Sequence, residues 1–438
     1  MGKLKNFLRG LGLTLIVIAG LVGWTLLPWI AVLICAMALA AWLMLTRSGQ
    51  RTLSVARVGV AGIPQRWGAS LVIVVGIAGV VGVLVALLAM GEGFQAMLAQ
   101  TGSEDTAIVL RGGSQTELNS TITRDQATLV AQAPGVARDD QGRPIASAEL
   151  VLIANLPKKT SGTDANVEIR GVGAEAFDLR RNVQIVEGRA FEPGLRELIV
   201  GEGAQEQFAG LDPGQQIELN NQQWTIVGVF ASGDAHQSEL WGDTETLASA
   251  YRREAFQSVT VRVVDSGAFD TFKAALASDT RLKLDVSTTL DYYSEQSEGL
   301  TKLIRILSIT VGSIMAVGAI FGALNTMYAA VAGRAREIAT LRAIGFRGLS
   351  VVVSVMLETM LLAFAGGVIG GFIAWIIFNG YTVSTLGSNF SQVVFDFRVS
   401  PGLLWDGLKW ALAIGFVGGL FPAVRAARLP VATALREL

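Results

Sequence analysis

The segment Gly68–Met90 reads GASLVIVVGIAGVVGVLVALLAM and contains no charged side chain. A helix needs about 20 apolar residues to cross about 30 Å of hydrocarbon at a rise of 1.5 Å per residue. Inside a bilayer every backbone group must be bonded internally, which a helix achieves within one segment. The segment therefore predicts a transmembrane helix, and a long polar stretch that begins at Glu92 follows it directly.

Further apolar runs extend this pattern. Leu11–Leu45 has no charge and would measure about 52 Å as one straight helix, which exceeds the thickness of a bilayer. Pro28 predicts a turn that divides this run into a hairpin of two helices within residues 1–46. Six spans are therefore expected, because three more segments are long and apolar enough to cross, namely Leu303–Val331, Val351–Phe378 and Leu403–Val424.

A cleaved secretory signal is the alternative interpretation of the first run. Lys3, Lys5 and Arg9 would form its basic start, and the small residues at 36–41 would lie near a cleavage site. The apolar part is about twice as long as that of a signal peptide, which favours the hairpin.

The charges predict the orientation of the chain. Residues 92–302 carry 31 acidic and 18 basic residues, a net charge of −13. The first ten residues, the loops 47–67 and 332–349, and the C-terminal tail carry 14 basic and 2 acidic residues. Because short cytoplasmic loops are rich in Lys and Arg, we expect both termini in the cytoplasm and the large polar segment outside it.

Residues 92–302 are long enough to form a core of their own without a disulfide, since the only cysteine is Cys35 in the apolar hairpin. Their pattern predicts two strand-helix-strand units that close into one α+β layer. Residues 160–255 between the units contain short strands separated by Gly, Pro and Asn turns, which predicts an inserted β-rich subdomain. The expected fold is thus an α-helical membrane bundle joined to a large α+β domain.

The chain offers little for catalysis or cofactor binding. Its single histidine, His236, follows Gly233-Asp234-Ala235, and we interpret it as a solvent-exposed residue of a turn. Acidic residues such as Asp139 and Asp140 are scattered, which is typical of a soluble surface and not of a calcium site. The phosphate-binding pattern GxxxxGK[ST] does not occur. We therefore expect no cofactor, no metal and no catalytic site in this chain, and no nucleic-acid partner.

The most informative polar motif is the stretch RAREIATLRAIGF at residues 334–346, between two predicted spans. As a helix it places Ile338 and Leu341 on one side together with Ile344 or Ala343, and Gly345 is a plausible helix end. One interpretation is a helix at the membrane surface whose arginines face anionic lipid.

The sequence also resembles a known family over residues 68–438. The motif at Arg336–Phe346, Asn325-Thr326-Met327 before it, Glu358 in the next span and the closing FPAxxAARLPVxxALR at residues 421–436 are similar to the MacB/FtsX type of ABC transporter permease. In the polar segment, EGRxF at residues 187–191 and WTIVGVF at residues 224–230 resemble the extracytoplasmic domain of MacB.

The resemblance implies a bacterial inner-membrane permease with four spans, a large periplasmic domain after the first span and a homodimeric assembly. Partners implied are a dimer of cytoplasmic ABC ATPase subunits, the lipid bilayer and a periplasmic adaptor protein. The helix within residues 334–346 would be the element that couples the permease to the ATPase. Its coupling residues would be Arg336, Glu337, Ile338, Leu341, Arg342, Ile344, Gly345 and Phe346.

Glu358 lies inside a predicted span, where an unpaired carboxylate is costly. We expect it to pair with Arg334 or Arg336 in a structural role. A proton relay is the alternative, which the lack of a second ionisable residue along the path disfavours.

Three functions follow from these observations. The first is export by mechanotransmission, in which ATP hydrolysis in a separate subunit moves the periplasmic domains and a peptide, lipid, lipoprotein or drug-like substrate is expelled. The second is an FtsX-like signalling device that regulates a cell-wall hydrolase without transport. The third, a membrane-bound enzyme, is disfavoured by the near absence of histidine and cysteine.

Overall fold

The computed structural model describes residues 23–25, 27–265, 267–279, 281–387, 389, 391–428 and 430. The chain divides into two compact units. The membrane unit comprises Met1–Met90, Leu303–Asn379 and Arg398–Leu438, and the sheet unit comprises Gly91–Lys302 and Gly380–Phe397. The predicted first limb of the N-terminal hairpin falls largely outside the described residues.

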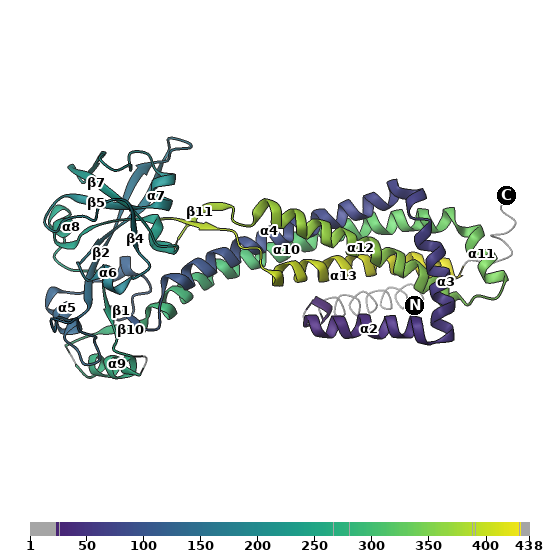
Figure 1. Cartoon of the computed structure of the whole chain (residues 1–438), viewed down its shortest axis with the longest axis horizontal. Helices are drawn as coiled ribbons and strands as arrows, with labels where there is room; N and C mark the ends of the chain where they lie inside the picture. Colours follow the sequence, from purple (N-terminus) through teal and green to yellow (C-terminus); the bar gives the residue numbers. More distant parts are fainter. Residues whose placement is uncertain are drawn as a thin grey trace, which may run out of the picture. The chain divides into compact units, whose positions relative to one another are not determined.

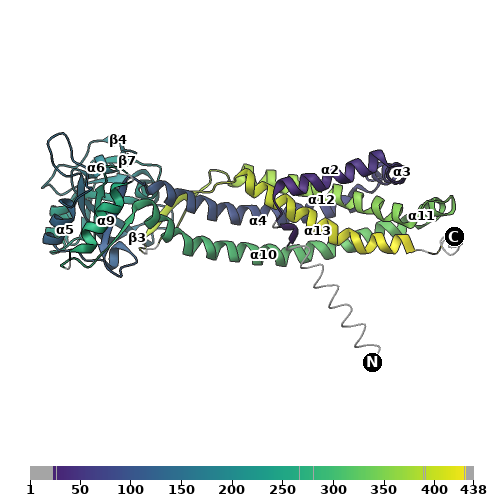
Figure 2. The same cartoon turned by 90° about the horizontal axis from the view of Figure 1, so that it is seen from below.

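Four described helices are long and apolar enough to cross a membrane, as the sequence predicts. In the membrane unit, α10, α12, α13 and the first part of α4 lie alongside one another (Figures 1 and 2). Their bounds are α4 (Trp67–Thr101), α10 (Thr289–Gly333), α12 (Gly348–Phe378) and α13 (Pro401–Arg428).

Glycines allow these helices to approach closely. A Cβ atom added to Gly367 of α12 would lie 2.7 Å from the Cβ of Ala411 in α13. One added to Gly418 of α13 would lie 2.7 Å from the Cβ of Ala323 in α10. Such contacts are typical of membrane bundles, where small residues let helix backbones pack against each other.

The described part of the N-terminal region contains a helix where a loop was predicted. Helix α2 (Trp29–Leu45) follows Pro28 and is apolar, and α3 (Arg47–Ala61) follows it after a bend of 97°. Together the bent pair could count as one further span, so the described residues contain four such helices, or up to five spans with this pair. The prediction of six spans includes a first limb that falls largely outside the described residues. Residues 47–67, predicted as a loop, are mostly helical because Thr46 caps α3 by accepting a hydrogen bond from the backbone of Gly49.

The sheet unit is built on one ten-stranded mixed sheet. Nine strands follow the order β10-β1-β9-β2-β3-β8-β5-β7-β4, and β6 pairs with β7. The strands are β1 (Thr106–Arg111), β2 (Ala146–Pro157), β3 (Asp164–Val172), β4 (Gln184–Gly188), β5 (Glu197–Gly201), β6 (Gln216–Leu219), β7 (Gln222–Ala231), β8 (Glu239–Asp243), β9 (Ser258–Arg262) and β10 (Leu284–Thr288).

Both predicted strand-helix-strand units are present in this sheet. The first is β1, α5 (Arg124–Ala131) and β2, and the second is β9, α9 (Ala268–Ser278) and β10. They close into one layer because β1 pairs with β9 and β10, and β9 pairs with β2. Phe272 of α9 and Val130 of α5 are fully buried in the core between these helices and the strands.

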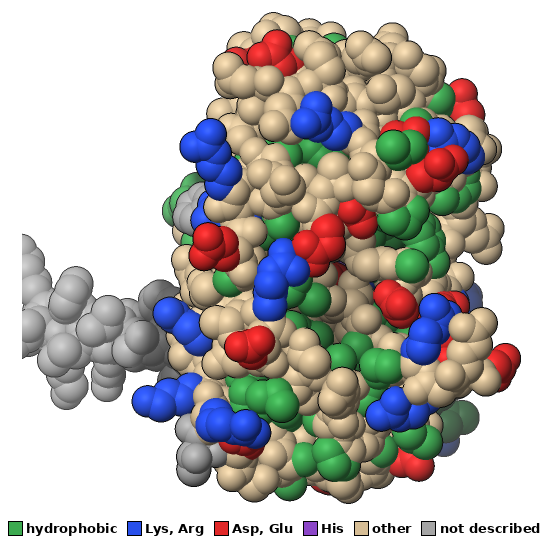
Figure 3. Space-filling model, turned by 90° about the vertical axis from the view of Figure 1, so that its left-hand side faces the viewer, with side chains coloured by type: hydrophobic (Ala, Val, Ile, Leu, Met, Phe, Trp, Pro, Cys, Tyr) green, Lys and Arg blue, Asp and Glu red, His purple; other side chains and the backbone are tan. Residues whose placement is uncertain are grey.

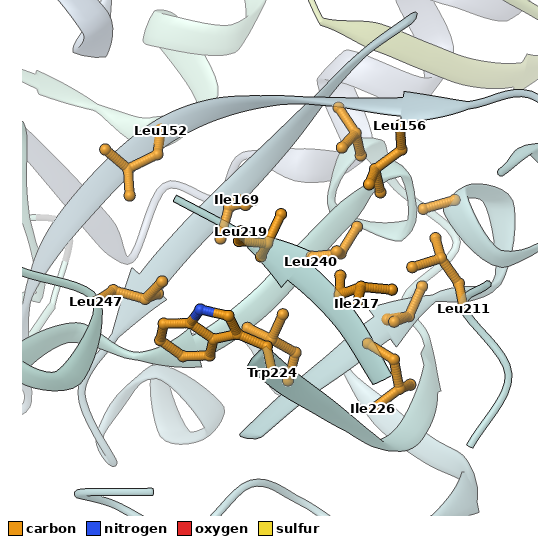
Figure 4. Close-up of a cluster of buried hydrophobic side chains, with 14 of the residues drawn as sticks. Leu152, Leu156, Ile169, Leu211, Ile217, Leu219, Trp224, Ile226, Leu240 and Leu247 are labelled. Atoms are coloured by element: carbon orange, nitrogen blue, oxygen red, sulfur yellow. The ribbon is translucent and has the colours of Figure 1, made fainter. Parts of the chain in front are cut away.

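The inserted strands have a core of their own. Trp224 of β7 is completely buried and lies among aliphatic side chains from several strands (Figure 4). The short helices α7 (Glu202–Gln207) and α8 (Thr244–Ala250) contribute Ala204 and Leu247 to the same core. Burial of these side chains is the main stabilising term for a segment that has no disulfide.

Residues 380–397 lie within residues 303–438, for which three spans were predicted, but they do not belong to the membrane unit. They form a hairpin of β11 (Thr382–Leu386) and β12 (Gln392–Asp396) that belongs to the sheet unit. The backbone N–H of Val394 donates to the Ser238 hydroxyl at 2.9 Å, and the Lys158 ammonium donates to the Gln392 side chain at 3.3 Å.

The face of the sheet unit drawn in Figure 3 carries interspersed acidic and basic side chains, as expected for a solvated surface.

Candidate functional site

The predicted coupling motif forms a short helix, α11 (Ala335–Ala343), between α10 and α12. The turn that terminates the helix contains Gly345, whose φ of 102° lies in the left-handed region that favours glycine. The backbone N–H of Phe346 donates to the carbonyl of Leu341 and closes the last turn. The predicted helix and its stop therefore agree with the structure.

The side chains of α11 divide into an anchored and an exposed set. Ile338 is buried, whereas Leu341, Arg342 and Phe346 are partly buried. The exposed members of the predicted coupling set are Arg336, Glu337, Ile344 and Gly345. The apolar anchor of the helix is thus Ile338, and the exposed charges and Ile344, which is 69% exposed, form a surface that a second protein can reach.

Glu358 of α12 lies under the start of α11 and is almost completely buried. Arg334 donates to its Oε2 atom at 3.0 Å, and Arg66 donates to its Oε1 atom at 3.2 Å. The pairing with Arg334 was one of the two expected from the sequence, whereas Arg336 is exposed and Arg66 was not anticipated. Two ion pairs compensate a carboxylate whose burial without a partner would be costly.

The ion pairs of Glu358 with Arg66 and Arg334, which we call the Glu358 clamp, connect four elements. Arg66 immediately precedes α4, Arg334 immediately precedes α11, and Glu358 itself belongs to α12. Arg334 also donates to Glu337 of α11 at 3.2 Å. Gly59 of α3 is close by, since a Cβ atom added there would lie 3.5 Å from Glu358 Oε2. These contacts connect the beginning of α11 to the beginning of α4 and to α12, next to α3.

A second ionised cluster is buried in the sheet unit around Arg170 of β3. The guanidinium donates to Glu117, Glu149, Glu168 and Glu239 at distances of 2.8 to 3.1 Å. The Arg170 side chain is 2% exposed. The sequence interpretation, in which acidic residues serve a soluble surface, misses this cluster because its members come from four separated elements.

Arg180 and His236 complete the cluster. Arg180 binds both carboxylate oxygens of Glu149, at 2.7 and 2.8 Å. Its Nε–H also faces Nε2 of His236 at 3.0 Å, while Nδ1 of His236 lies 3.2 Å from Glu239. Because a guanidinium can only donate, Nε2 must accept, which assigns the proton of a neutral His236 to Nδ1.

The prediction of a solvent-exposed His236 is therefore wrong. The side chain is 1% exposed and packs edge-on against Trp241 and Tyr293. The chain bends at Gly233 and Asp234, and His236 lies in the short 3-10 helix Ala235–Ser238 that leads into strand β8. This position directs its side chain into the interior of the sheet unit.

The cluster shifts the pKa values of two of its carboxylates in opposite directions. Burial and the neighbouring Glu239 charge raise the pKa of Glu168 to about 8. Burial alone would also raise the pKa of Glu239, but the Arg170 charge outweighs it and the pKa is lowered. Glu168 is therefore the carboxylate of the cluster that binds a proton most readily, and its Oε2 atom accepts hydrogen bonds from Asn389 and Ser391 of the β11–β12 segment at 3.1 and 3.2 Å.

The cluster borders a cavity of about 50 Å³ within the sheet unit, lined by Tyr292, Tyr293 and Gln296 among others. This volume accommodates a few water molecules and no larger ligand. Within the described residues, no group of three or more His, Cys, Asp or Glu side chains is placed to hold a metal ion. The arrangement serves to fix the hairpin and the sheet to each other.

Two family models match the chain. Residues 70–279 match the MacB-like periplasmic core domain, and residues 309–431 match the FtsX-like permease C-terminal domain. The first range covers the sheet unit up to α9, and the second contains α11 and Glu358.

Curated relatives are macrolide export ATP-binding/permease proteins named MacB. The protein of Bordetella avium is 27% identical over 393 residues, which cover 83% of this chain and 57% of the relative. That of Burkholderia thailandensis is 26% identical over 402 residues, with 83% and 56% covered. The chain therefore spans little more than half the length of the relatives it matches.

Solved structures with similar segments include the periplasmic region of MacB from Actinobacillus actinomycetemcomitans, at 16% identity and a TM-score of 0.33. That match covers 42% of this chain and 89% of the solved one. The extracellular domain of the noncanonic ABC-type transporter YknZ matches at 16% identity and the same TM-score of 0.33, covering 42% of this chain and 100% of the solved one.

Proposed function

Because this chain belongs to the MacB/FtsX family of ABC transporter permeases, we propose that it is a non-catalytic permease subunit that works by mechanotransmission. ATP hydrolysis takes place in a separate ATPase dimer, and α11 docks on that ATPase. Two copies of the chain form the permease. The sheet units then move on the periplasmic side and expel a peptide, lipid, lipoprotein or drug-like substrate with the help of an adaptor protein.

The observation that carries the proposal is the Glu358 clamp. A helix that only rests on the membrane surface needs no rigid connection to the bundle. Arg334 instead ties the first turn of α11 to Glu358, which Arg66 ties to the start of α4. Since α4 and α12 are spans, a push on α11 becomes a displacement of the membrane helices.

The surface of α11 suits a protein partner. Arg336 and Glu337 offer opposite charges that fix register, and Ile344 offers an exposed apolar anchor. In this proposal α11 and both termini lie in the cytoplasm, where an ATPase can reach them; the basic residues that flank the spans support this orientation. Export is favoured over regulation of a hydrolase because the matched domain is of the MacB type.

Two substitutions on α11 test the docking. Glu337→Lys and Leu341→Asp should each abolish co-purification of the ATPase subunit while the chain still inserts into the membrane at normal yield. Asp265→Lys, at an exposed position of the sheet unit, is the matched control and should leave co-purification unchanged. Normal recovery of the ATPase with both α11 variants would refute the coupling role.

A further inference from the structure

Helix α3 crosses the membrane unit in a direction that differs from its neighbours. It is bent by 97° from α2, and Figure 1 shows it running across the direction of α2 and α12. The side chains of α2 are apolar and mostly exposed, as in a helix that faces lipid; examples are Trp29, Ile34, Met37 and Leu45. If α2 follows the membrane normal, α3 lies in the plane of the membrane surface.

One face of α3 is fixed to the bundle. The hydroxyl groups of Thr52 and of Ser350 on α12 form a hydrogen bond of 3.1 Å, and both side chains are buried. Val55, Ala56 and Gly59 are buried on the same face. This spacing of three and four residues marks a helix whose opposite face is free.

The free face of α3 is basic. Arg47, Arg51 and Arg57 are exposed, and the structure records no ion pair for any of them among the described residues. The sequence contains no Asp or Glu before Glu92, so the face has no acidic neighbour along the chain. Three exposed arginines along one helical face without a counter-charge are available to bind an external anion.

The depth of α3 indicates which anion is in reach. Trp67 follows it closely and is 71% exposed at the start of the span α4. Exposed tryptophans at the ends of spans are typical of the headgroup region. An apolar helix precedes α3 and an exposed tryptophan at the beginning of a span follows it, an arrangement typical of a helix at the level of the lipid headgroups.

We propose that the basic face of α3, defined by Arg47, Arg51 and Arg57, binds anionic phospholipid headgroups of the adjacent leaflet. The guanidinium groups match phosphate geometry and are attracted to a negative membrane surface. Helix α3 also contacts α12 close to Glu358, to which Arg334 at the beginning of α11 is paired. Anionic lipid bound to α3 therefore stabilises the position of the helices to which α11 is connected. The occupant is lipid and not the ATPase, for which α11 provides the exposed surface.

The single cysteine allows a direct test. In a Cys35→Ala background, Ser54→Cys on the exposed side of α3 carries a fluorescent donor. The full chain is placed in nanodiscs that contain phosphatidylcholine and phosphatidylglycerol, with a headgroup acceptor on one lipid or the other. Energy transfer should report enrichment of phosphatidylglycerol around α3, by about five-fold for each arginine engaged, and the enrichment should fall as salt rises.

Matched variants separate charge from folding. The triple change Arg47→Gln, Arg51→Gln and Arg57→Gln should bring the two lipids to equal transfer, whereas the corresponding triple change to Lys should keep most of the enrichment. The same number of Arg→Gln changes on the sheet unit should have no effect; exposed positions for it are Arg111, Arg252 and Arg253. Equal transfer in the parent chain, unchanged enrichment in the triple Gln variant, or displacement of the lipid by added ATPase subunit would overturn the proposal.

Discussion

Replacement of Arg170 by Met tests whether the buried cluster holds the sheet unit together. Arg170 donates to four glutamates, and its loss leaves those carboxylates with Arg180 as the remaining cation of the cluster. Breaking one buried ion pair by removing a partner costs about 3–5 kcal/mol. We expect a loss of unfolding free energy of at least this size.

The loss converts into a measurable shift. The sheet unit, Gly91–Lys302 with Gly380–Phe397, has about 230 residues, and for that size 1 kcal/mol corresponds to roughly 2–4 °C in Tm. Arg170→Met should therefore lower the unfolding temperature by roughly 6–20 °C. Tryptophan fluorescence of the full chain in detergent is a suitable assay, because Trp224 and Trp241 are buried in the sheet unit.

A surface pair provides the control. Arg124 and Glu245 form a similar pair at 2.7 Å, but their side chains are 49% and 61% exposed. Arg124→Met should cost less than about 1 kcal/mol. Adding Glu239→Gln to Arg170→Met should restore part of the loss, because it removes a buried charge that Arg170 compensates in the parent chain. Equal shifts for Arg170→Met and Arg124→Met would refute the reasoning.

Three further predictions concern single groups. Burial and Glu239 raise the pKa of Glu168 to about 8, so the folded state binds a proton that the unfolded state releases. The contribution of Glu168 to stability is therefore complete below the ordinary pKa of 4.5 and is lost as pH rises through about 8. Glu168→Gln should flatten this part of a curve of Tm against pH, and an unchanged slope would contradict the assignment. Glu358→Leu leaves Arg66 and Arg334 without their carboxylate, and it should reduce ATP-driven transport in proteoliposomes by more than ten-fold while ATPase binding persists; full transport would contradict the clamp. Gly345→Val, forced to a φ of 102°, should cost about 1–3 kcal/mol locally and accelerate proteolysis at the end of α11, whereas unchanged cleavage would argue against the αL helix end.

The sequence was informative wherever the physical constraint is local. The length of an apolar run and the cost of a lone carboxylate predict the four spans and the pairing of Glu358 with Arg334. Gly345 marks the end of α11 because few other residues adopt its backbone conformation.

Features that depend on distant residues were missed. Arg66 reaches Glu358 across 292 positions, and nothing in a local window indicates that approach. The same holds for Arg170, whose glutamate partners lie on four elements, and for His236, whose burial depends on the strand that follows it. The hairpin at residues 380–397 is a two-stranded sheet of its own, and the unit to which it belongs is otherwise formed by residues much earlier in the chain.

Site-specific photo-crosslinking from α11 tests the central claim most directly. A crosslinker on Ile344→Cys in the Cys35→Ala background, with Ser161→Cys on the sheet unit as the control site, is activated in native membranes, and the captured proteins are identified by mass spectrometry. The account predicts that the α11 probe captures an ABC ATPase subunit, more efficiently when ATP is bound, and that the control probe does not. Capture of the ATPase at the control site, or of lipid alone from α11, would contradict it.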